Sequence, residues 1–184
     1  MSEILLAKGR PDDLTGREAR EIAAYDFLDK LGIDYTRADH APANTMQACV
    51  EIDERLGLHI CKNLFLCNRQ KTAFYLLLMP DDKPFATKEL SGQLGVARLS
   101  FGSAEDLQAH LGLLPGSVSV LGLLNDPERE VRLLIDRDLL GCERFGCHPL
   151  VNTSTLTFTT RELLDVVIPA LGHTPTVVDL GQGE

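Results

Sequence analysis

The sequence H-I-C-K-N-L-F-L (residues 59–66) passes through the polar turn N-R-Q-K (68–71) into T-A-F-Y-L-L-L-M (72–79). Two apolar runs joined by a short polar turn predict a β-hairpin, and their nearly continuous hydrophobicity predicts buried strands. Lys62 stands at the mouth of the first run, where a buried ammonium is costly unless a partner or ligand compensates it. A lysine at a strand end can also extend its ammonium into water, and the pattern alone favours that interpretation.

The composition around this hairpin is that of a soluble globular protein. The chain has 184 residues, of which 44% are hydrophobic and 24% are charged, so we expect one domain over residues 1–184. No apolar run approaches the ~18 residues of a membrane-spanning helix. The N-terminus, M-S-E-I-L-L-A-K-G-R, is too short and too acidic for a signal peptide. These features predict a cytoplasmic protein that does not contact a membrane.

The net charge of −9 argues against a protein that coats DNA or RNA by counterion release. It still allows a protein that grips the end of an RNA with a few local cations. The candidates for such a patch are Lys62, Arg69, Lys71, Lys88 and Arg98, although the sequence does not show that they cluster.

The five cysteines, at positions 49, 61, 67, 142 and 147, are odd in number and scattered, which argues against a disulfide framework. A zinc site could be assembled from four of them with His148, but the chain lacks the C-x-x-C pair that structural zinc sites use. It also lacks a P-loop, a G-x-G-x-x-G fingerprint and an H-E-x-x-H helix. We therefore predict neither a metal nor a cofactor.

The remaining pattern is a mixed α/β one. Thr15 and Glu18 form a candidate capping box for a first helix that Gly32 ends, after a loose lead-in over residues 1–14. We expect further helices at 45–56, 87–94, 104–111 and 160–170, strands at 33–39, 96–101, 131–135 and 156–158, and a strand or extended loop at 117–124. The fold class is α/β mixed (α+β): a central, mostly antiparallel sheet or open barrel flanked by helices.

A second informative stretch is F-G-C-H-P-L-V-N-T-S-T (145–155). The proline restricts His148 to extended backbone, which can aim its ring into a cleft, although the residues alone slightly favour a partly buried structural histidine bonded to backbone. Cys147 points to the opposite face of an extended segment, so it does not form a dyad with His148. His40 we interpret as a surface-loop histidine.

Three features could share one site: Lys62, the small-residue loop 115–119, and His148 with Asn152 and Thr153. The set supplies a cation, backbone amides and neutral hydrogen-bonding groups, but no serine nucleophile in a G-x-S-x-G elbow. Such a set suits ester hydrolysis, in which loop amides stabilise charge on oxygen and polar groups or a substrate hydroxyl position the attacking water.

At these residues the chain resembles the YbaK/prolyl-tRNA synthetase-associated family of aminoacyl-tRNA editing proteins, in particular the free-standing type that deacylates Ala-tRNA(Pro). The resemblance covers about residues 17–180. It is carried by Y-T-R-A-D-H-A-P-A-N-T (35–45), K-N-L-F-L (62–66), R-L-S-F-G (98–102), L-L-P-G-S-V-S-V-L-G-L-L-N-D (113–126) and H-P-L-V-N-T-S-T (148–155).

The resemblance implies roles that the spacing alone does not. Lys62 matches the lysine that the family requires for deacylation, and His148 and Asn152 match positions that line the aminoacyl pocket, with Thr153 beside them. A family loop of the form G-x-x-x-P, which shapes that pocket, corresponds to Gly116, Ser117, Val118, Ser119 and Val120. A small pocket admits alanine and rejects proline, and the terminal ribose hydroxyl of the substrate replaces a protein base. The implied partner is the acceptor end of mischarged tRNA, and prolyl-tRNA synthetase is a further candidate partner.

Two positions depart from the family pattern. Val120 stands where the loop motif has proline, and Cys147 stands where relatives carry an aromatic residue before His-Pro. Two hypotheses remain open from the sequence. The first is a trans-editing hydrolase; the alternative is a non-catalytic or altered-specificity module that binds aminoacyl-tRNA or a small ligand.

Overall fold

The predicted hairpin is the centre of the fold. The computed structural model describes residues 4–58 and 60–181, so His59, the first residue of the predicted stretch, lies outside the described residues. Strands β3 (Lys62–Cys67) and β4 (Phe74–Met79) pair antiparallel. The Asn68 side chain closes the turn by accepting a hydrogen bond from the amide of Thr72 at 2.8 Å. Every residue of β4 is buried, as the continuous apolar run predicted.

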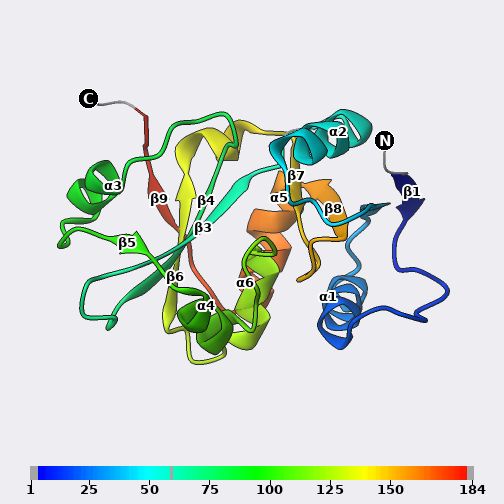
Figure 1. Ribbon diagram of the computed structural model, residues 1–184, viewed down its shortest axis with the longest axis horizontal. Helices are drawn as coiled ribbons and strands as arrows, with labels where there is room; N and C mark the ends of the chain where they lie inside the picture. The colour runs from blue at the N-terminus through cyan, green and yellow to red at the C-terminus, as the bar shows by residue number, and fades with distance from the viewer. Residues whose placement is uncertain (1–3, 59, 182–184) are drawn as a thin grey trace.

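The strands divide between two sheets, which Figure 1 shows side by side. The larger sheet has the order β5-β3-β4-β6-β9, with β4–β6 and β6–β9 parallel and the other pairs antiparallel, and the smaller one, β1-β2-β8-β7, is antiparallel throughout. The other strands are β1 (Leu5–Lys8), β2 (Thr36–Asp39), β5 (Ser100–Phe101), β6 (Val131–Asp136), β7 (Arg144–Cys147), β8 (Ser154–Thr159) and β9 (Thr176–Val178). The predicted α/β mixed fold is confirmed.

The helices flank these sheets largely where the sequence placed them. They are α1 (Ala19–Lys30), α2 (Met46–Leu56), α3 (Thr87–Leu94), α4 (Ala104–Leu111), the 3₁₀ segments η1 (Val120–Asn125) and η2 (Arg137–Gly141), and a C-terminal helix of α5 (Thr160–Glu162), the π segment η3 (Leu163–Val167) and α6 (Ile168–Ala170). Capping boxes begin α4 and α5. In each, a side-chain oxygen of the residue before the helix accepts a hydrogen bond from the third amide of the helix.

Four local predictions were wrong. Of the strand predicted over residues 96–101, only Ser100–Phe101 forms, as the short strand β5. Helix α1 begins after Glu18 without a side-chain cap, because the amide of Thr15 binds Asp13 instead. The lead-in contains β1, which pairs with β2. The segment 117–124, predicted as extended, turns at Ser119 into the 3₁₀ helix η1, where burial of an apolar segment outweighs its strand-like composition.

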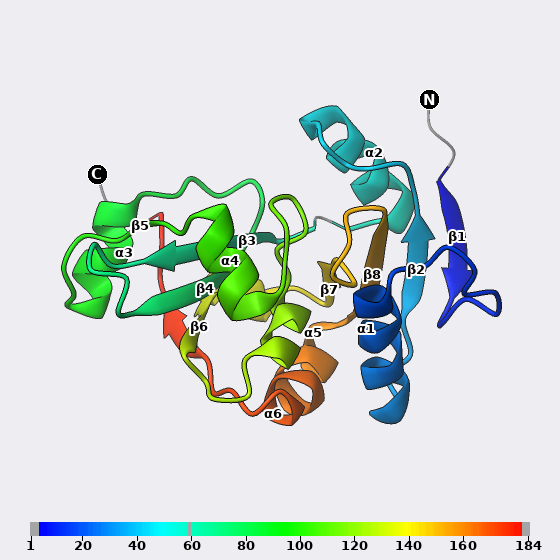
Figure 2. The ribbon, with the colours of Figure 1, turned by 60° about the horizontal axis from the view of Figure 1, so that its bottom comes forward.

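Two apolar clusters lie on opposite faces of the larger sheet. One fills the space between the two sheets and receives Cys61, Phe65 and Cys67 from the hairpin, while the other lies beneath α3 and receives Leu66. The first cluster includes buried residues of α1 and of the C-terminal helix, and Figure 2 shows α3 at the opposite side of the molecule from α1. Because side chains alternate along a strand, Lys62 begins on the same side of the sheet as Leu66.

Among residues 4–58 and 60–181, the longest helix is α1, with 12 residues. No helix in this part of the chain is long and apolar enough to cross a membrane.

Candidate active site

The loop at Gly116 and the segment at His148 lie against each other. Gly116 has φ +87°, and a Cβ added there would stand 3.7 Å from the Asn152 amide nitrogen. That nitrogen donates to the Asn44 side-chain oxygen at 3.0 Å. Further along the loop, the Ser119 side chain acts on the Cys147 thiol, whose pKa it lowers against the larger effect of burial. The structure thus joins two predicted parts of the site across more than twenty residues of sequence.

The loop is fixed by its own serines. Ser117 is buried and bonds the Leu114 carbonyl through both its amide and its hydroxyl, at 3.1 and 2.8 Å. Ser119 is fully buried and caps η1 by accepting from the Leu121 amide at 3.3 Å. Among the described residues, the amide of the half-buried Val118 makes no hydrogen bond, so it remains available to an oxygen of a ligand.

Val120, where the family motif has proline, is the first residue of η1 and is fully buried. Proline is favoured at this position of a helix because the amide there has no intrahelical partner and the fixed φ of proline suits the first turn. In this chain the Ser119 cap and the burial of Val120 fix the start of the helix. The Val120 side chain packs into the apolar core.

His148 is held as a neutral ring, and its Nε2 makes no hydrogen bond within the part of the chain that the structure describes. Its Nδ1 lies 2.9 Å from the main-chain oxygen of Ser154. A carbonyl can only accept, so Nδ1 carries the proton and Nε2 keeps a lone pair. Burial lowers the pKa of His148; the Ser154 bond partly opposes this effect, and nearby His40 adds to it. The ring therefore stays neutral near pH 7 and presents an acceptor.

His40 is not the surface histidine that the sequence suggested. It is 8% exposed, its Nε2 lies 2.9 Å from the Thr155 hydroxyl, and its ring centroid is 6.5 Å from that of His148. Its main-chain amide also donates to the Thr153 carbonyl at 3.0 Å. In the sequence, each histidine is followed by a proline within two residues, as H-A-P at 40–42 and H-P at 148–149. This shared feature was the available signal that the two segments resemble each other.

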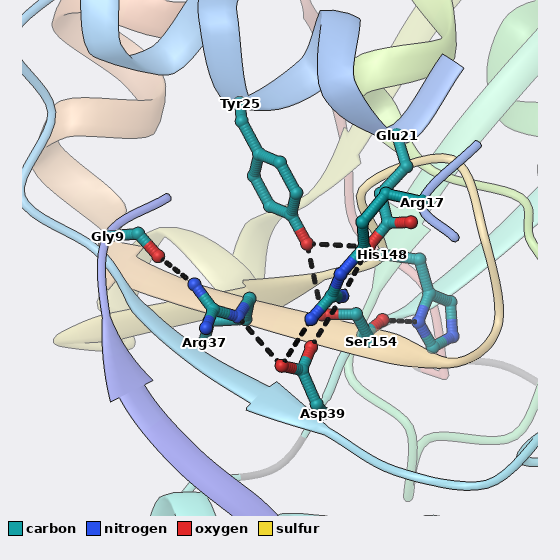
Figure 3. A network of polar contacts seen from close by, with 8 residues as sticks. All are labelled: Gly9, Arg17, Glu21, Tyr25, Arg37, Asp39, His148 and Ser154. Carbon is teal, nitrogen blue, oxygen red and sulfur yellow. Dashed lines mark hydrogen bonds and ion pairs between the residues drawn. The ribbon is translucent and has the colours of Figure 1, made fainter. Parts of the chain in front are cut away.

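A buried polar network supports His148 from behind (Figure 3). The Ser154 hydroxyl, on the residue whose carbonyl binds His148, lies 3.5 Å from the Tyr25 hydroxyl. Burial raises the pKa of Tyr25, which stays protonated and donates to the Glu21 carboxylate at 2.7 Å. The strand that carries the His148 partner is thereby tied to helix α1.

The network continues to the edge of the smaller sheet (Figure 3). Arg17 binds Glu21 at 2.7 Å and both oxygens of Asp39, at 2.9 and 2.7 Å. Arg37 bonds the same Asp39 carboxylate at 3.0 Å and also the Gly9 carbonyl. Burial by itself raises the pKa of Asp39, but the bonds from the two arginines outweigh it and hold that pKa below its usual value.

Lys62 occupies the start of β3, half-buried, and its ammonium donates to the main-chain oxygen of Lys83. The preceding residue, Cys61, contacts the Gly146 carbonyl at 3.6 Å, so the start of β3 lies beside β7, the strand that leads to His148. No hydrogen bond joins the Lys62 ammonium to the His148 ring among the described residues. An ammonium has three donors, and the Lys83 carbonyl uses one.

Asn63, next to Lys62, was not predicted as a site residue. Its amide nitrogen donates to the Cys61 carbonyl at 3.1 Å, whereas its buried Oδ1 has no hydrogen-bond partner within residues 4–58 and 60–181. An unpaired buried acceptor is costly, so it marks a position where a ligand donor would be stabilising. Sequence pattern alone gives no signal for this, because it depends on what surrounds one atom.

Of the remaining predicted residues, Val118 packs partly against the core and Thr153 is exposed. Burial raises the pKa of Cys147 to about 12, despite the opposing effect of the Ser119 side chain, so its thiol is not a nucleophile near neutral pH. All five cysteines are free. Within the described part of the chain, no group of three or more His, Cys, Asp or Glu residues could hold a metal ion.

Comparisons with known proteins identify the family to which the chain belongs. The family model of the aminoacyl-tRNA editing domain matches residues 40–166, which include Lys62, the Gly116 loop and His148. The chain belongs to the aminoacyl-tRNA editing family. The resemblance that the sequence motifs carried is therefore confirmed.

Two curated relatives extend over most of the chain. Prolyl-tRNA editing protein ProX of Acetoanaerobium sticklandii is 34% identical over 153 residues, which cover 83% of this chain and 93% of the relative. Prolyl-tRNA synthetase associated domain-containing protein 1 of Danio rerio is 32% identical over 155 residues, covering 83% of each chain. A family member that edits aminoacyl-tRNA cleaves the ester between amino acid and tRNA, so this protein is an aminoacyl-tRNA deacylase.

Solved structures show the same fold at low sequence identity. A protein described as a candidate trans-editing enzyme for prolyl-tRNA synthetase superposes with a TM-score of 0.65, 20% identity, and coverage of 90% of this chain and 99% of that one. A scaffold protein used for grafting linear epitopes superposes with a TM-score of 0.69 and 21% identity, covering 91% and 99%. The editing-domain fold thus extends beyond residues 40–166.

Proposed function

We propose that the protein is a trans-editing hydrolase that deacylates mischarged tRNA, with Ala-tRNA(Pro) as its substrate and prolyl-tRNA synthetase as the enzyme whose errors it corrects. Family membership supports the reaction class, and the names of the relatives point to prolyl-tRNA. The observation that carries the proposal is the contact of the Gly116 loop with Asn152, beside the neutral ring of His148.

The groups at this contact suit ester hydrolysis without a protein nucleophile. The available amide of Val118 would stabilise the negative charge that develops on the ester carbonyl oxygen. Water attacks the carbonyl carbon, the bond to the terminal ribose oxygen breaks, and that oxygen takes the proton. The neighbouring ribose hydroxyl orients the water, and the free Nε2 of His148 accepts a hydrogen bond from the substrate.

The same contact offers a reason for specificity. A synthetase cannot fully reject a smaller side chain by binding alone, so a second site must remove the error. The close approach of Asn152 to Gly116 restricts the space for a side chain, which favours alanine over proline. Lys62 contributes a fixed positive charge with two unused donors, which would orient the terminal nucleotide or the ester.

A panel of aminoacyl-tRNAs tests the proposal. Purified protein is incubated with Ala-tRNA(Pro), Pro-tRNA(Pro) and unrelated mischarged tRNAs, and release of labelled amino acid is followed. We expect Ala-tRNA(Pro) to be hydrolysed at least about 10-fold faster than Pro-tRNA(Pro), as one size-selective step allows. Tight binding of tRNA without hydrolysis of any member of the panel would contradict the proposal and favour the non-catalytic binding module.

The pH dependence of deacylation reports the state of His148. Because burial lowers its pKa below the ordinary value of 6.5, the ring remains neutral until the pH falls below 6.5. We expect kcat/KM to fall on the acid side with an apparent pKa below 6.5, as protonation removes the Nε2 acceptor. A profile measured from about pH 5 to about pH 8 checks this.

His40 is the control, because burial lowers its pKa as well and it lies beside His148. The acid limb should persist in His40→Asn and disappear, at reduced rate, in His148→Gln. An inflection at or above pH 6.5 would show that the ring of His148 is not the group that titrates.

A further inference from the structure

A basic cleft lies at the end of the hairpin away from Lys62. It has a volume of about 790 Å³ and lies between the β3–β4 turn, the start of α3 and strand β5, which Figure 2 shows gathered at that end of the larger sheet. Three of the described residues that line it are cations, Arg69, Lys71 and Arg98, and none is a carboxylate. The structure thus clusters three of the five cations that the sequence left unplaced.

The two arginines of this cleft are not neutralised within the protein. Lys71 is engaged, because its ammonium lies 2.8 Å from the Asp106 carboxylate on α4. Arg69 and Arg98 are exposed and have no carboxylate or hydrogen-bond partner among residues 4–58 and 60–181. In a chain of net charge −9, two uncompensated arginines on one cleft make a local site for anions on a surface that otherwise repels them.

An aromatic ring stands exposed at the same cleft. Phe101 is 60% exposed on β5, an edge strand, and its ring meets Phe85 edge-on with the centroids 5.9 Å apart. The contact with Phe85 restrains the Phe101 ring while most of it faces solvent. A positively charged groove with an exposed aromatic ring is the combination by which proteins hold single-stranded nucleic acid.

We propose that this cleft binds the RNA strand of the tRNA acceptor arm, with Arg69 and Arg98 on backbone phosphates and Phe101 stacked on an unpaired base. The assignment rests on the proposed function, since it takes the RNA to be the one whose 3′ end reaches the Gly116 loop. Strand β3 connects the two places: Lys62 is its first residue and Cys67, which lines the cleft, is its last. They are about 17 Å apart at 3.3 Å per residue, so nucleotides preceding the terminal adenosine can reach the cleft.

Binding of uncharged tRNA at several salt concentrations tests the assignment directly. The double variant Arg69→Ala/Arg98→Ala should bind at least about 10-fold more weakly at low salt, and the slope of log affinity against log salt should shrink by about 1.4, or about 0.7 for each lost phosphate contact. Phe101→Ala should weaken binding by about 5-fold or more with the slope kept. The matched control is Arg161→Ala, an exposed arginine on α5 that pairs with Asp165, which should bind as wild type does.

Kinetics separate the cleft from the catalytic site. The ratio of kcat/KM on aminoacyl-tRNA to that on aminoacyl-adenosine should fall about 10-fold in the double variant, because only the full tRNA reaches the cleft. If wild type deacylates but the double variant matches Arg161→Ala in affinity and slope, the cleft assignment alone is wrong. If wild type binds tRNA through the cleft but deacylates nothing, the proposed function is wrong and the cleft assignment stands.

The competing occupant is a second copy of the chain, because an exposed edge strand can pair with another edge. Sedimentation of wild type and Phe101→Ala distinguishes the two. Loss of a dimer in Phe101→Ala, with tRNA affinity unchanged, would overturn the RNA assignment.

Discussion

Replacing Lys62 by methionine lowers kcat/KM for Ala-tRNA(Pro) by roughly 10²- to 10³-fold, the usual cost of removing one fixed electrostatic contact to a reacting ester. Methionine keeps most of the apolar length of the side chain and removes only the charge and its donors. Among residues 4–58 and 60–181, the half-buried ammonium has one acceptor, the Lys83 carbonyl, which leaves two donors for the substrate. Single-turnover release of labelled alanine measures the effect.

Two further variants sharpen this result. Lys62→Arg should recover only part of the rate, because a planar guanidinium is wider than an ammonium and distributes its donors differently. Lys30→Ala, which removes an exposed lysine from the last turn of α1, should retain the wild-type rate. A Lys62→Met rate within about twofold of wild type, in a protein with unchanged thermal unfolding, would return Lys62 to the strand-end lysine that its pattern first suggested.

Local signals in the sequence predicted the parts of the fold that local interactions decide. The hairpin, the capped start of α4 at Ser103 and the end of α3 at Gly95 follow from adjacent residues. The first strand, β1, escaped prediction because it is a half-exposed edge strand with no apolar alternation, and only its pairing with β2 stabilises it. Helix η1 escaped because burial, not composition, decided its conformation.

The residues of the candidate site also divide into those that the sequence located and those that it did not. Sequence motifs located Lys62, the Gly116 loop and His148, since each stands in a recognisable segment. They did not locate His40 or Asn63, whose roles depend on distant contacts. His40 becomes buried only because β2 pairs with β8, more than one hundred residues later. The unpaired Oδ1 of Asn63 likewise results from how its surroundings pack, and such packing leaves no periodic pattern in the sequence.

The basic cleft shows a third case, in which the sequence supplied the residues but not their grouping. Arg69 follows β3 and Arg98 precedes β5, and the antiparallel pairing of these strands brings both to one end of the sheet. Lys62, at the opposite end of β3, is separated from them by the length of the strand. The cations that the sequence left unplaced therefore lie at two different places, Lys62 at one end of β3 and the arginines at the other.

Replacing Asp136 by alanine lowers the free energy of unfolding by about 3–5 kcal/mol, the typical cost of removing one partner of a buried ion pair. Asp136 is fully buried at the end of β6 and binds the Lys83 ammonium at 2.8 and 3.0 Å. It also accepts from the amides of Asp138 and Leu180, at 2.9 and 3.2 Å, which the variant would leave without this acceptor. Urea unfolding followed by circular dichroism measures the loss.

The matched control touches the same ammonium. Asp138 lies 2.8 Å from Lys83, but its side chain is 57% exposed, so solvent screens the pair and Asp138→Ala should cost about 1 kcal/mol or less. The contrast has a functional consequence, because the Lys83 carbonyl is the acceptor for Lys62. Asp136→Ala should therefore also slow deacylation at temperatures where it remains folded, whereas Asp138→Ala should not. Equal losses of stability in the two variants would show that burial of the Lys83–Asp136 pair does not fix the loop that carries Lys83.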